Sequence, residues 1–287
     1  MSGSPWARWM LLAASAQGNK VVAATWGATS DFGFIYTSQD GGTNWTITSA
    51  PLASWEGLAS SADGNTIVAV AYYDYIYVST NSGLNWTTAV APNTFWSSVA
   101  CSADGSRMTA SVQNRQAFQL GTLYTSSDYG VTWTNEDVPQ ESWWRLAESA
   151  EGTSLLGAIS GDYGGPPGPI YASMDSGVSW ARTDAPDIYW ESVACSADGC
   201  KQVASGYGGI YTRQTTPHPV LNVIPNASKL ILSWVIPSIP FVLQQTSGLD
   251  NGWADVLITP VLNSLNLHYE VSVPKPTGTV FYRLASR

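Results

Sequence analysis

Two carboxylates, one guanidinium and three aromatic rings are the side chains of this sequence whose types and spacing suit a chemical role. Each lies within two positions of a tryptophan that recurs along the chain, and they are Glu56, Phe95, Trp144, Arg145, Tyr189 and Glu191. Aromatic faces beside a few polar groups suit the binding of sugars. Two carboxylates catalyse glycoside hydrolysis when about 5–9 Å separates them. All six are therefore candidate ligand-binding residues, and Glu56 and Glu191 are the catalytic candidates if the protein is an enzyme.

The elements that must position these residues form an internal repeat. Four segments share the pattern S-x-D-x-G-x-x-W, with Asn replacing Asp in the second, and their last residues are Trp45, Trp86, Trp133 and Trp180. Ten positions after each of these stands a second tryptophan, and six further on comes a Ser-Ala-[Asp/Glu]-Gly turn. Turn residues between short β-prone runs indicate about four strands in each unit. Such a unit, repeated every 41–47 residues, is typical of a propeller blade.

The acidic residues of the four S-x-D-x-G-x-x-W segments are expected to hold a turn rather than to do chemistry. The Ser and Asp side chains can accept hydrogen bonds from turn amides, the Gly allows a sharp bend, and the Trp folds back over it. The asparagine in the second segment, Asn81, supports this interpretation, because an amide makes similar hydrogen bonds but is a poor acid. The residues at this position are Asp40, Asn81, Asp128 and Asp175.

This pattern resembles the Asp-box, or bacterial neuraminidase, repeat of sialidases, related secreted glycosidases and photosystem assembly factors. The resemblance covers Trp9 to about Tyr211 and implies a β-propeller whose boxes lie at the periphery, away from any active site. Sialidases bind the substrate carboxylate with three arginines. Here the family's Phe/Tyr-Arg-Ile-Pro element is missing, and no three arginines share a repeat position. The resemblance therefore concerns the fold and argues against sialidase chemistry.

We expect an all-β protein with two domains, a five-bladed propeller over residues 1–216 and a small β-sandwich-like domain over 217–287. Six or seven blades are less favoured, because the C-terminal part does not repeat. The fifth copy begins at Trp190 and has Thr212-Arg-Gln-Thr-Thr216 where the box should be, so its fourth strand is missing. The run Val220-Leu-Asn-Val223 is one candidate to replace that strand. The C-terminal part resembles the short β-domain of many secreted bacterial repeat proteins.

Composition excludes several classes of function. The net charge is −9 and the 12 Lys and Arg residues are scattered, so there is no basic stripe for nucleic acid. No apolar run approaches the roughly 20 residues of a membrane span, and the start does not have the pattern of a signal peptide. Cys195 and Cys200 flank a turn, which leaves open whether they form a disulfide. Neither histidine lies near a cysteine, so we predict no metal and no cofactor.

Three functions remain open. The first is a non-enzymatic binding protein, secreted or on the cell surface, that recognises a glycan or a protein surface through the propeller face. The second is a glycoside hydrolase or lyase, and the third is an assembly or scaffold factor. Long loops at 25–34, 113–121 and 161–169 form a second variable region that could carry any of these functions.

Overall fold

The computed structural model describes residues 7–27, 32–113, 121–159, 166–215, 219–237 and 239–286. All regular structure within these ranges is β-strand. The first blade is a four-stranded antiparallel sheet in which neighbours in sequence are neighbours in space. Its strands are β1 (Arg8–Ala14), β2 (Val21–Trp26), β3 (Ile35–Ser38) and β4 (Thr46–Ile47).

The next three blades repeat this order. Blade 2 consists of β5 (Trp55–Ser60), β6 (Ile67–Asp74), β7 (Ile76–Ser79) and β8 (Thr87–Thr88). Blade 3 consists of β9 (Thr94–Cys101), β10 (Met108–Val112), β11 (Leu123–Ser126) and β12 (Thr134–Asn135). Blade 4 consists of β13 (Trp143–Glu148), β14 (Leu155–Ile159), β15 (Ile170–Ser173) and β16 (Ala181–Arg182).

Blade 5 has three strands in the described part of the chain: β17 (Trp190–Cys195), β18 (Lys201–Gly206) and β19 (Gly209–Gln214). The predicted all-β, five-bladed arrangement is thereby confirmed, with the expected gap at the fourth strand of the last blade. The run Val220–Val223 does not fill that gap. Its last two residues belong to β20 (Asn222–Pro225), which pairs with another C-terminal strand, β21 (Lys229–Val235), so that candidate was wrong.

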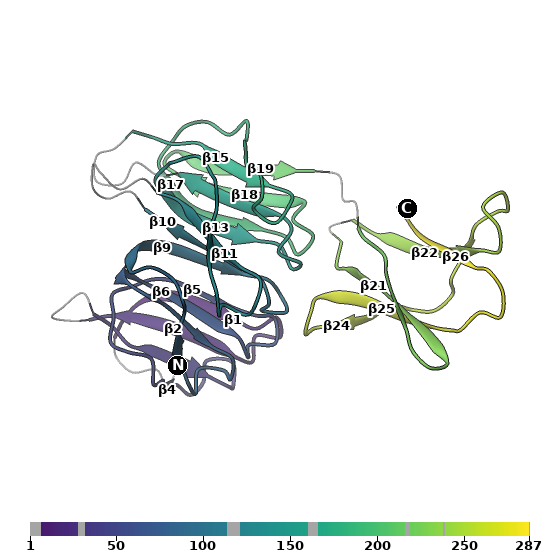
Figure 1. Cartoon of the computed structure of the whole chain (residues 1–287), viewed down its shortest axis with the longest axis horizontal. Helices are drawn as coiled ribbons and strands as arrows, with labels where there is room; N and C mark the ends of the chain where they lie inside the picture. The colour runs from purple at the N-terminus through teal and green to yellow at the C-terminus, as the bar shows by residue number, and fades with distance from the viewer. Residues whose placement is uncertain are drawn as a thin grey trace.

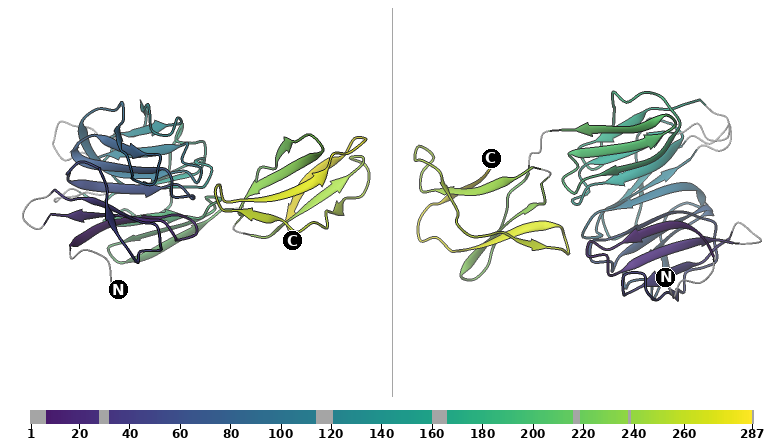
Figure 2. Two further views of the ribbon diagram at one scale, coloured as in Figure 1. Left: turned by 90° about the horizontal axis from the view of Figure 1, so that it is seen from below. Right: turned by 180° about the vertical axis from the view of Figure 1, so that it is seen from behind.

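The first strand of each blade lies innermost, and the five blades follow one another around an arc with blades 1 and 5 at its ends (Figures 1 and 2). One backbone hydrogen bond joins the turns after the inner strands in each pair of neighbouring blades. Ala16 N–H donates to the Ala62 carbonyl at 2.8 Å, and the same bond runs from Ala62 to Ala103, from Ala103 to Ala150 and from Ala150 to Ala197. We call this end of the arc the turn end. The opposite end, where the inner strands begin, is the mouth end.

The core lies between the blades, which explains why the second tryptophan of the repeat recurs. Trp96, Trp143 and Trp190 are at most 1% exposed, and Trp190 packs edge-on against Tyr211 with ring centroids 5.1 Å apart. Small residues complete each interface, such as Ala24 and other alanines of the second strands. Blades 2–4 lie between two other blades, so successive residues of their second strands are buried rather than alternately buried and exposed, as in β6, β10 and β14.

Each S-x-D-x-G-x-x-W segment forms a hairpin at the turn end, which we call a box hairpin. In blade 1, Ser38 Oγ accepts from Gly42 N–H at 2.9 Å, Asp40 Oδ1 accepts from Asn44 N–H at 2.9 Å, and Trp45 Nε1 donates to the Gly42 carbonyl at 3.0 Å. Hydrogen bonds from Asn44 lower the pKa of Asp40 to about 2. These contacts occupy the Ser, Asp and Trp side chains in holding the turn, and they recur in blades 2–4.

Blade 5 leaves one face uncovered by another blade. Ile210, on its third strand, is 75% exposed. In blades 1–4 the same repeat position is at most 4% exposed, and its residues are Ile35, Ile76, Leu123 and Ile170. In blades 1–4 the following blade covers this position, whereas within the described ranges no blade packs on that side of blade 5. The arc therefore ends on a sheet face built like an inter-blade interface.

The C-terminal strands form two sheets that face one another. One contains β20, β21, β25 (His268–Pro274) and β24 (Val261–Asn263), and the other contains β23 (Ala254–Asp255), β22 (Phe241–Thr246) and β26 (Phe281–Ser286). Both sheets contribute to a core made of Leu232, Trp234, Leu243, Val271 and Val273. We call residues 219–286 the C-terminal unit. The domain boundary predicted at 216/217 lies outside the described residues and stays a prediction.

The C-terminal unit contacts the turn end of the arc. Val235 packs against the turn alanines of three successive blades, Ala62, Ala103 and Ala150. His268 Nε2 lies 3.4 Å from Glu151 Oε1 in the turn of blade 4. The turn end is therefore the covered end of the arc, which leaves the mouth end as the place to look for a ligand.

Candidate functional site

A β-bulge interrupts each inner strand at the mouth end. The pairing with the second strand skips the residue directly after the recurrent tryptophan, and the skipped residues are Met10, Glu56, Ser97, Trp144 and Glu191. A bulged residue is outside the regular ladder, so its side chain is turned relative to its neighbours. Three of the six candidates from the sequence, Glu56, Trp144 and Glu191, are therefore bulge residues. The bulge itself could not be read from the sequence.

Trp144 and Arg145 form one rigid unit across blades 3 and 4. The Arg145 guanidinium carbon lies 3.9 Å from the Trp144 ring centroid, a cation–π geometry. Arg145 Nη1 also donates to the carbonyls of Ser97 and Trp144, at 3.1 and 3.2 Å. These contacts hold the indole in one orientation. Arg145 thus fixes the orientation of the Trp144 ring.

Phe95 is a support beneath the aromatic surface and not part of that surface. It is only 5% exposed, and its ring lies 5.2 Å from that of Tyr72 and 5.1 Å from that of Tyr73. Tyr73 is 64% exposed and adopts a positive φ of 51°. The pairing of β6 with β9, which joins Tyr72 to Phe95, merges blades 2 and 3 into one sheet and buries the phenyl ring. The exposed aromatic ring here is therefore that of Tyr73, which sequence reasoning missed.

Blade 5 presents two tyrosines at the mouth end. Tyr189 precedes β17, and Tyr207 sits at the tip of the β18–β19 hairpin with 82% of its surface exposed. Tyr207 N–H donates to the Tyr189 carbonyl at 2.9 Å, which holds the two residues beside each other. Glu191 is also exposed. Together they place an acidic group beside two accessible aromatic rings.

The two glutamates do not lie on neighbouring blades. Glu56 is on β5 of blade 2 and Glu191 is on β17 of blade 5, with blades 3 and 4 between them along the arc. Packing contacts join β5 to β1 and β9, whereas β17 contacts β13 and β14. The arrangement suits two separate polar contacts to an extended ligand better than an acid–base pair acting on a single bond.

Glu148 is the most strongly perturbed carboxyl group at the turn end. Burial raises its pKa to about 8, although a hydrogen bond with Thr109 and the charge of Arg107 act in the opposite direction. Its Oε2 has no hydrogen-bond partner among the described residues. Comparison of the repeats could have revealed it, since blades 3 and 5 have Cys101 and Cys195 at this position. Glu148 lies at the turn end, opposite the bulges, so we do not count it as part of the candidate site.

The cysteines are not arranged for chemistry. Cys101, Cys195 and Cys200 are free thiols, so the disulfide considered from the sequence is not formed. Burial raises the pKa of Cys195 to about 12, which keeps it protonated and poorly nucleophilic.

Across the described ranges, no three His, Cys, Asp or Glu side chains are grouped in a way that could hold a metal ion. No helix in these ranges is long and apolar enough to cross a membrane.

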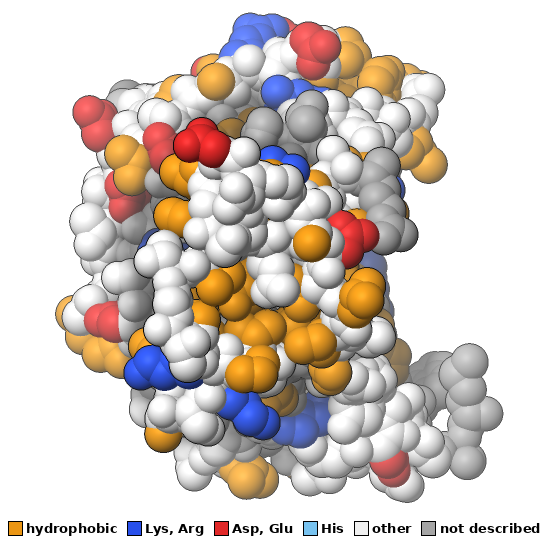
Figure 3. All heavy atoms as spheres, turned by 90° about the vertical axis from the view of Figure 1, so that its right-hand side faces the viewer, with side chains coloured by type: hydrophobic (Ala, Val, Ile, Leu, Met, Phe, Trp, Pro, Cys, Tyr) orange, Lys and Arg blue, Asp and Glu red, His pale blue; other side chains and the backbone are white. Residues whose placement is uncertain are grey.

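Much of the variable loop region predicted from the sequence (28–31, 114–120 and 160–165) falls outside the described residues. The outer face of the C-terminal unit carries a patch of hydrophobic side chains (Figure 3). In this unit a groove of about 470 Å³ is lined by Leu257, Ile258 and Tyr282, among others, and Leu257 is 95% exposed.

No protein-family model matches the sequence, and no curated protein matches it. Solved structures do match. A GH74 xyloglucanase from Xanthomonas campestris is 14% identical with a TM-score of 0.54, the match covering 88% of this chain and 38% of that one. A GH74 enzyme from Niastella koreensis is 14% identical with a TM-score of 0.51, over 97% of this chain and 65% of that one. YCF48 bound to D1 peptide is 12% identical with a TM-score of 0.52, over 90% of this chain and 84% of that one.

These similarities concern the fold. The chain spans less than two thirds of the length of the two GH74 proteins, and the identities are 14% or lower. Similarity at this level does not transfer an activity, because one fold carries many functions. The chain is an all-β protein with the β-propeller fold.

Proposed function

We propose that this protein binds a glycan, without catalysis, through the mouth end of its propeller. The observation that carries the proposal is the set of bulges, which turn Glu56, Trp144 and Glu191 out of the regular strand pairing at one end of the arc. Exposed aromatic rings flank them, those of Tyr73, Tyr189 and Tyr207 among them. Flat aromatic faces with a few carboxylates provide the stacking and hydrogen bonding that a sugar chain requires.

The rigidity of this surface supports binding as its role. Arg145 holds Trp144 in place before any ligand arrives, so little side-chain entropy is lost on association. Two of the similar structures are GH74 proteins, one of them described as a xyloglucanase, which favours a polysaccharide as the ligand. We also propose that the repeats are Asp-box repeats of the sialidase-like type. The protein would then act outside the cell, where such polymers are found.

We expect Trp144→Ala to weaken glycan binding by about tenfold or more, the equivalent of one stacking contact of about 1.4 kcal/mol. The measurement is a glycan array that includes xyloglucan oligosaccharides, followed by calorimetric titration of the best ligand. Tyr129→Ala is the matched control, because Tyr129 is an exposed aromatic residue in the box hairpin of blade 3 at the opposite end. Equal loss in both variants, or no glycan bound by the wild type, would contradict the proposal.

Hydrolysis is the second candidate, and the GH74 similarity is the observation that favours it. In that case the wild type releases reducing ends from a bound polysaccharide. Glu56→Gln and Glu191→Gln would then each remove turnover while leaving binding in place. If the protein instead binds peptides, as YCF48 is described as doing, the array stays silent and neither substitution changes any sugar reaction.

A further inference from the structure

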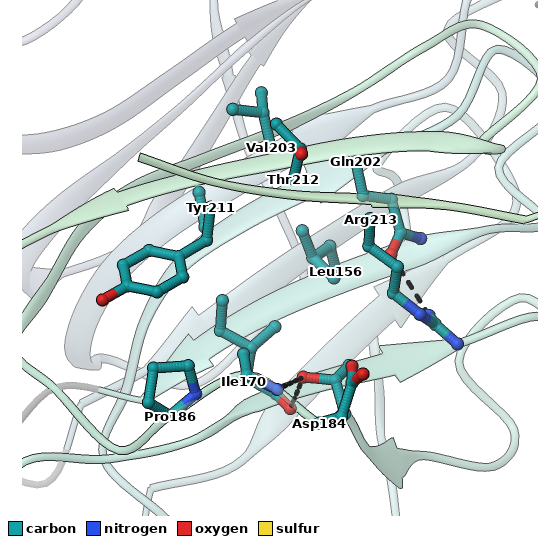
Figure 4. Close-up of a pocket in the computed structure, with 12 residues that line it drawn as sticks. Leu156, Ile170, Asp184, Pro186, Gln202, Val203, Tyr211, Thr212 and Arg213 are labelled. Carbon is teal, nitrogen blue, oxygen red and sulfur yellow. Dashed lines mark hydrogen bonds between the residues drawn. The ribbon is translucent and has the colours of Figure 1, made fainter. Parts of the chain in front are cut away.

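A pocket opens between blades 4 and 5. Its volume is about 210 Å³ (Figure 4). Its apolar lining comes from blade 4 on one side and blade 5 on the other: Leu156, Ile170, Ala185, Pro186, Ala204 and Tyr211. For scale, an engineered apolar cavity of roughly 150 Å³ binds benzene. The pocket is therefore large enough for an aromatic side chain.

The repeat shows what normally fills this place. In the first three interfaces the box tryptophan of the following blade packs into the core, and these residues are Trp86, Trp133 and Trp180. Trp86 belongs to the cluster that contains Ala50, and Ala50 holds the same repeat position as Ala185. Blade 5 has no box, so no tryptophan arrives over Ala185. The pocket is the site of an indole ring that three other interfaces contain.

The strand beside the pocket also lacks its usual neighbour. In blade 4 the residues after the box tryptophan form β16, which pairs with the outer edge of β15 through Ala172 and Ala181. In blade 5 the position of Ala172 is held by Thr212. Among the described residues, no strand pairs with the outer edge of β19. Thr212 is exposed, whereas Ala172 is buried in the interface between blades 4 and 5. An indole-sized pocket therefore adjoins a free sheet edge.

The polar groups lie at one end of the pocket. Arg213 and Asp184 stand at the side opposite Tyr211 and Pro186 (Figure 4). Arg213 Nη1 donates to Gln202 Oε1 at 3.3 Å. The apolar end suits a ring, and the charged end offers both a donor and an acceptor to the backbone or to a polar neighbour of that ring.

We propose that this pocket and the edge of β19 bind an extended segment of a partner protein, in which a tryptophan is followed by β-prone residues. The segment adds an antiparallel strand to β19 and inserts its indole between Ile170, Ala185 and Tyr211. Strand addition of this kind takes affinity from main-chain hydrogen bonds and specificity from a side-chain pocket. Strands β4, β8, β12 and β16, each with its preceding tryptophan, are the covalent counterparts of the occupant. The site is separate from the glycan-binding mouth.

The test uses the full chain and a synthetic peptide that copies residues 177–184, which hold Trp180 and β16. A second peptide has Ala in place of that tryptophan. We expect the tryptophan peptide to bind in calorimetry or fluorescence anisotropy, and the alanine peptide to bind at least about tenfold more weakly. Equal binding of both peptides, or no binding of either at millimolar concentration, overturns the proposal.

Protein variants locate the site. Ala185→Phe fills the pocket from the blade 4 side and Ala204→Leu fills it from the blade 5 side, and either should reduce peptide binding about tenfold. Leu84→Phe, at a residue 74% exposed in the box hairpin of blade 2, is the control and should leave binding unchanged. All three variants should retain any glycan binding. A failure of the peptide-binding proposal can therefore be distinguished from a failure of the glycan-binding proposal. If the protein forms a concentration-dependent dimer and Ala185→Phe abolishes it, the occupant of the site is a second copy of this chain. That result would overturn the proposal of a partner segment.

Discussion

Replacing Glu148 with Gln is expected to raise the melting temperature at pH 8 by about 5–10 °C and to leave it nearly unchanged at pH 4.5. Burial raises the pKa of Glu148 from 4.5 to about 8 in the folded protein. Below pH 4.5 the group is neutral in both the folded and the unfolded chain, so it imposes no penalty. Between pH 4.5 and 8 the unfolded chain loses the proton and the folded protein keeps it, so stability falls as pH rises.

The loss amounts to about 1.4 kcal/mol for each pH unit in that window and ends above pH 8, where the folded protein ionises as well. Relaxation around the group reduces the total, so we expect about 2–4 kcal/mol. Gln has the shape of the neutral acid and does not titrate, so the variant should show a flat profile where the wild type slopes downward. Asp137→Asn, at an exposed position, controls for the change in net charge. Parallel profiles for wild type and Glu148→Gln between pH 5 and 8 would show that the carboxyl is hydrated.

The number of blades could be predicted from the sequence because each repeated feature is a local device. The box tryptophan donates its Nε1 hydrogen bond to a glycine only three residues away, as in Trp45 to Gly42 at 3.0 Å. The turn serine and the residues it binds are also close in sequence, as in Thr66 N–H to Ser61 Oγ at 3.0 Å. Local contacts leave a local pattern, and the period of that pattern counts the blades.

The candidate site was harder to predict, because its features depend on pairing between distant residues. The bulge at Trp144 arises where β13 meets β14, and nothing in Trp143-Trp-Arg-Leu shows which residue leaves the ladder. Phe95 is buried by the pairing of β9 with β6, a contact between two blades that the repeat does not contain. Tyr73 gains its exposure from the same pairing. The strand positions of the candidate residues could thus be read from the sequence, but not which aromatic rings would face solvent.

The pocket between blades 4 and 5 shows how a departure from the repeat becomes informative in three dimensions. From the sequence, Thr212-Arg-Gln-Thr-Thr216 was a missing box and hence a missing strand. The structure adds that the preceding blade keeps the surface that would receive it, including Ala185 and Ile170. A repeat protein buries each unit against its neighbours, so a missing element leaves a complementary surface behind.

The last prediction compares one substitution at two equivalent positions. Ile35→Ala should destabilise the protein by about 2–5 kcal/mol, because the residue is 1% exposed and its loss leaves a cavity between blades 1 and 2. Ile210→Ala should change the free energy of unfolding by less than about 0.5 kcal/mol, because the residue is 75% exposed. Guanidinium denaturation of both variants at several protein concentrations measures the difference.

This comparison tests whether the arc ends at blade 5 in solution. The two isoleucines share a strand position and a residue type, so the intrinsic strand preferences cancel and the difference reports only what covers each side chain. A large cost at Ile210 that does not depend on concentration would mean that blade 5 packs on blade 1 and closes the ring. A large cost that grows with protein concentration would mean that a second copy covers the face. The open arc predicts neither, since a side chain already in water loses almost no burial when it is shortened.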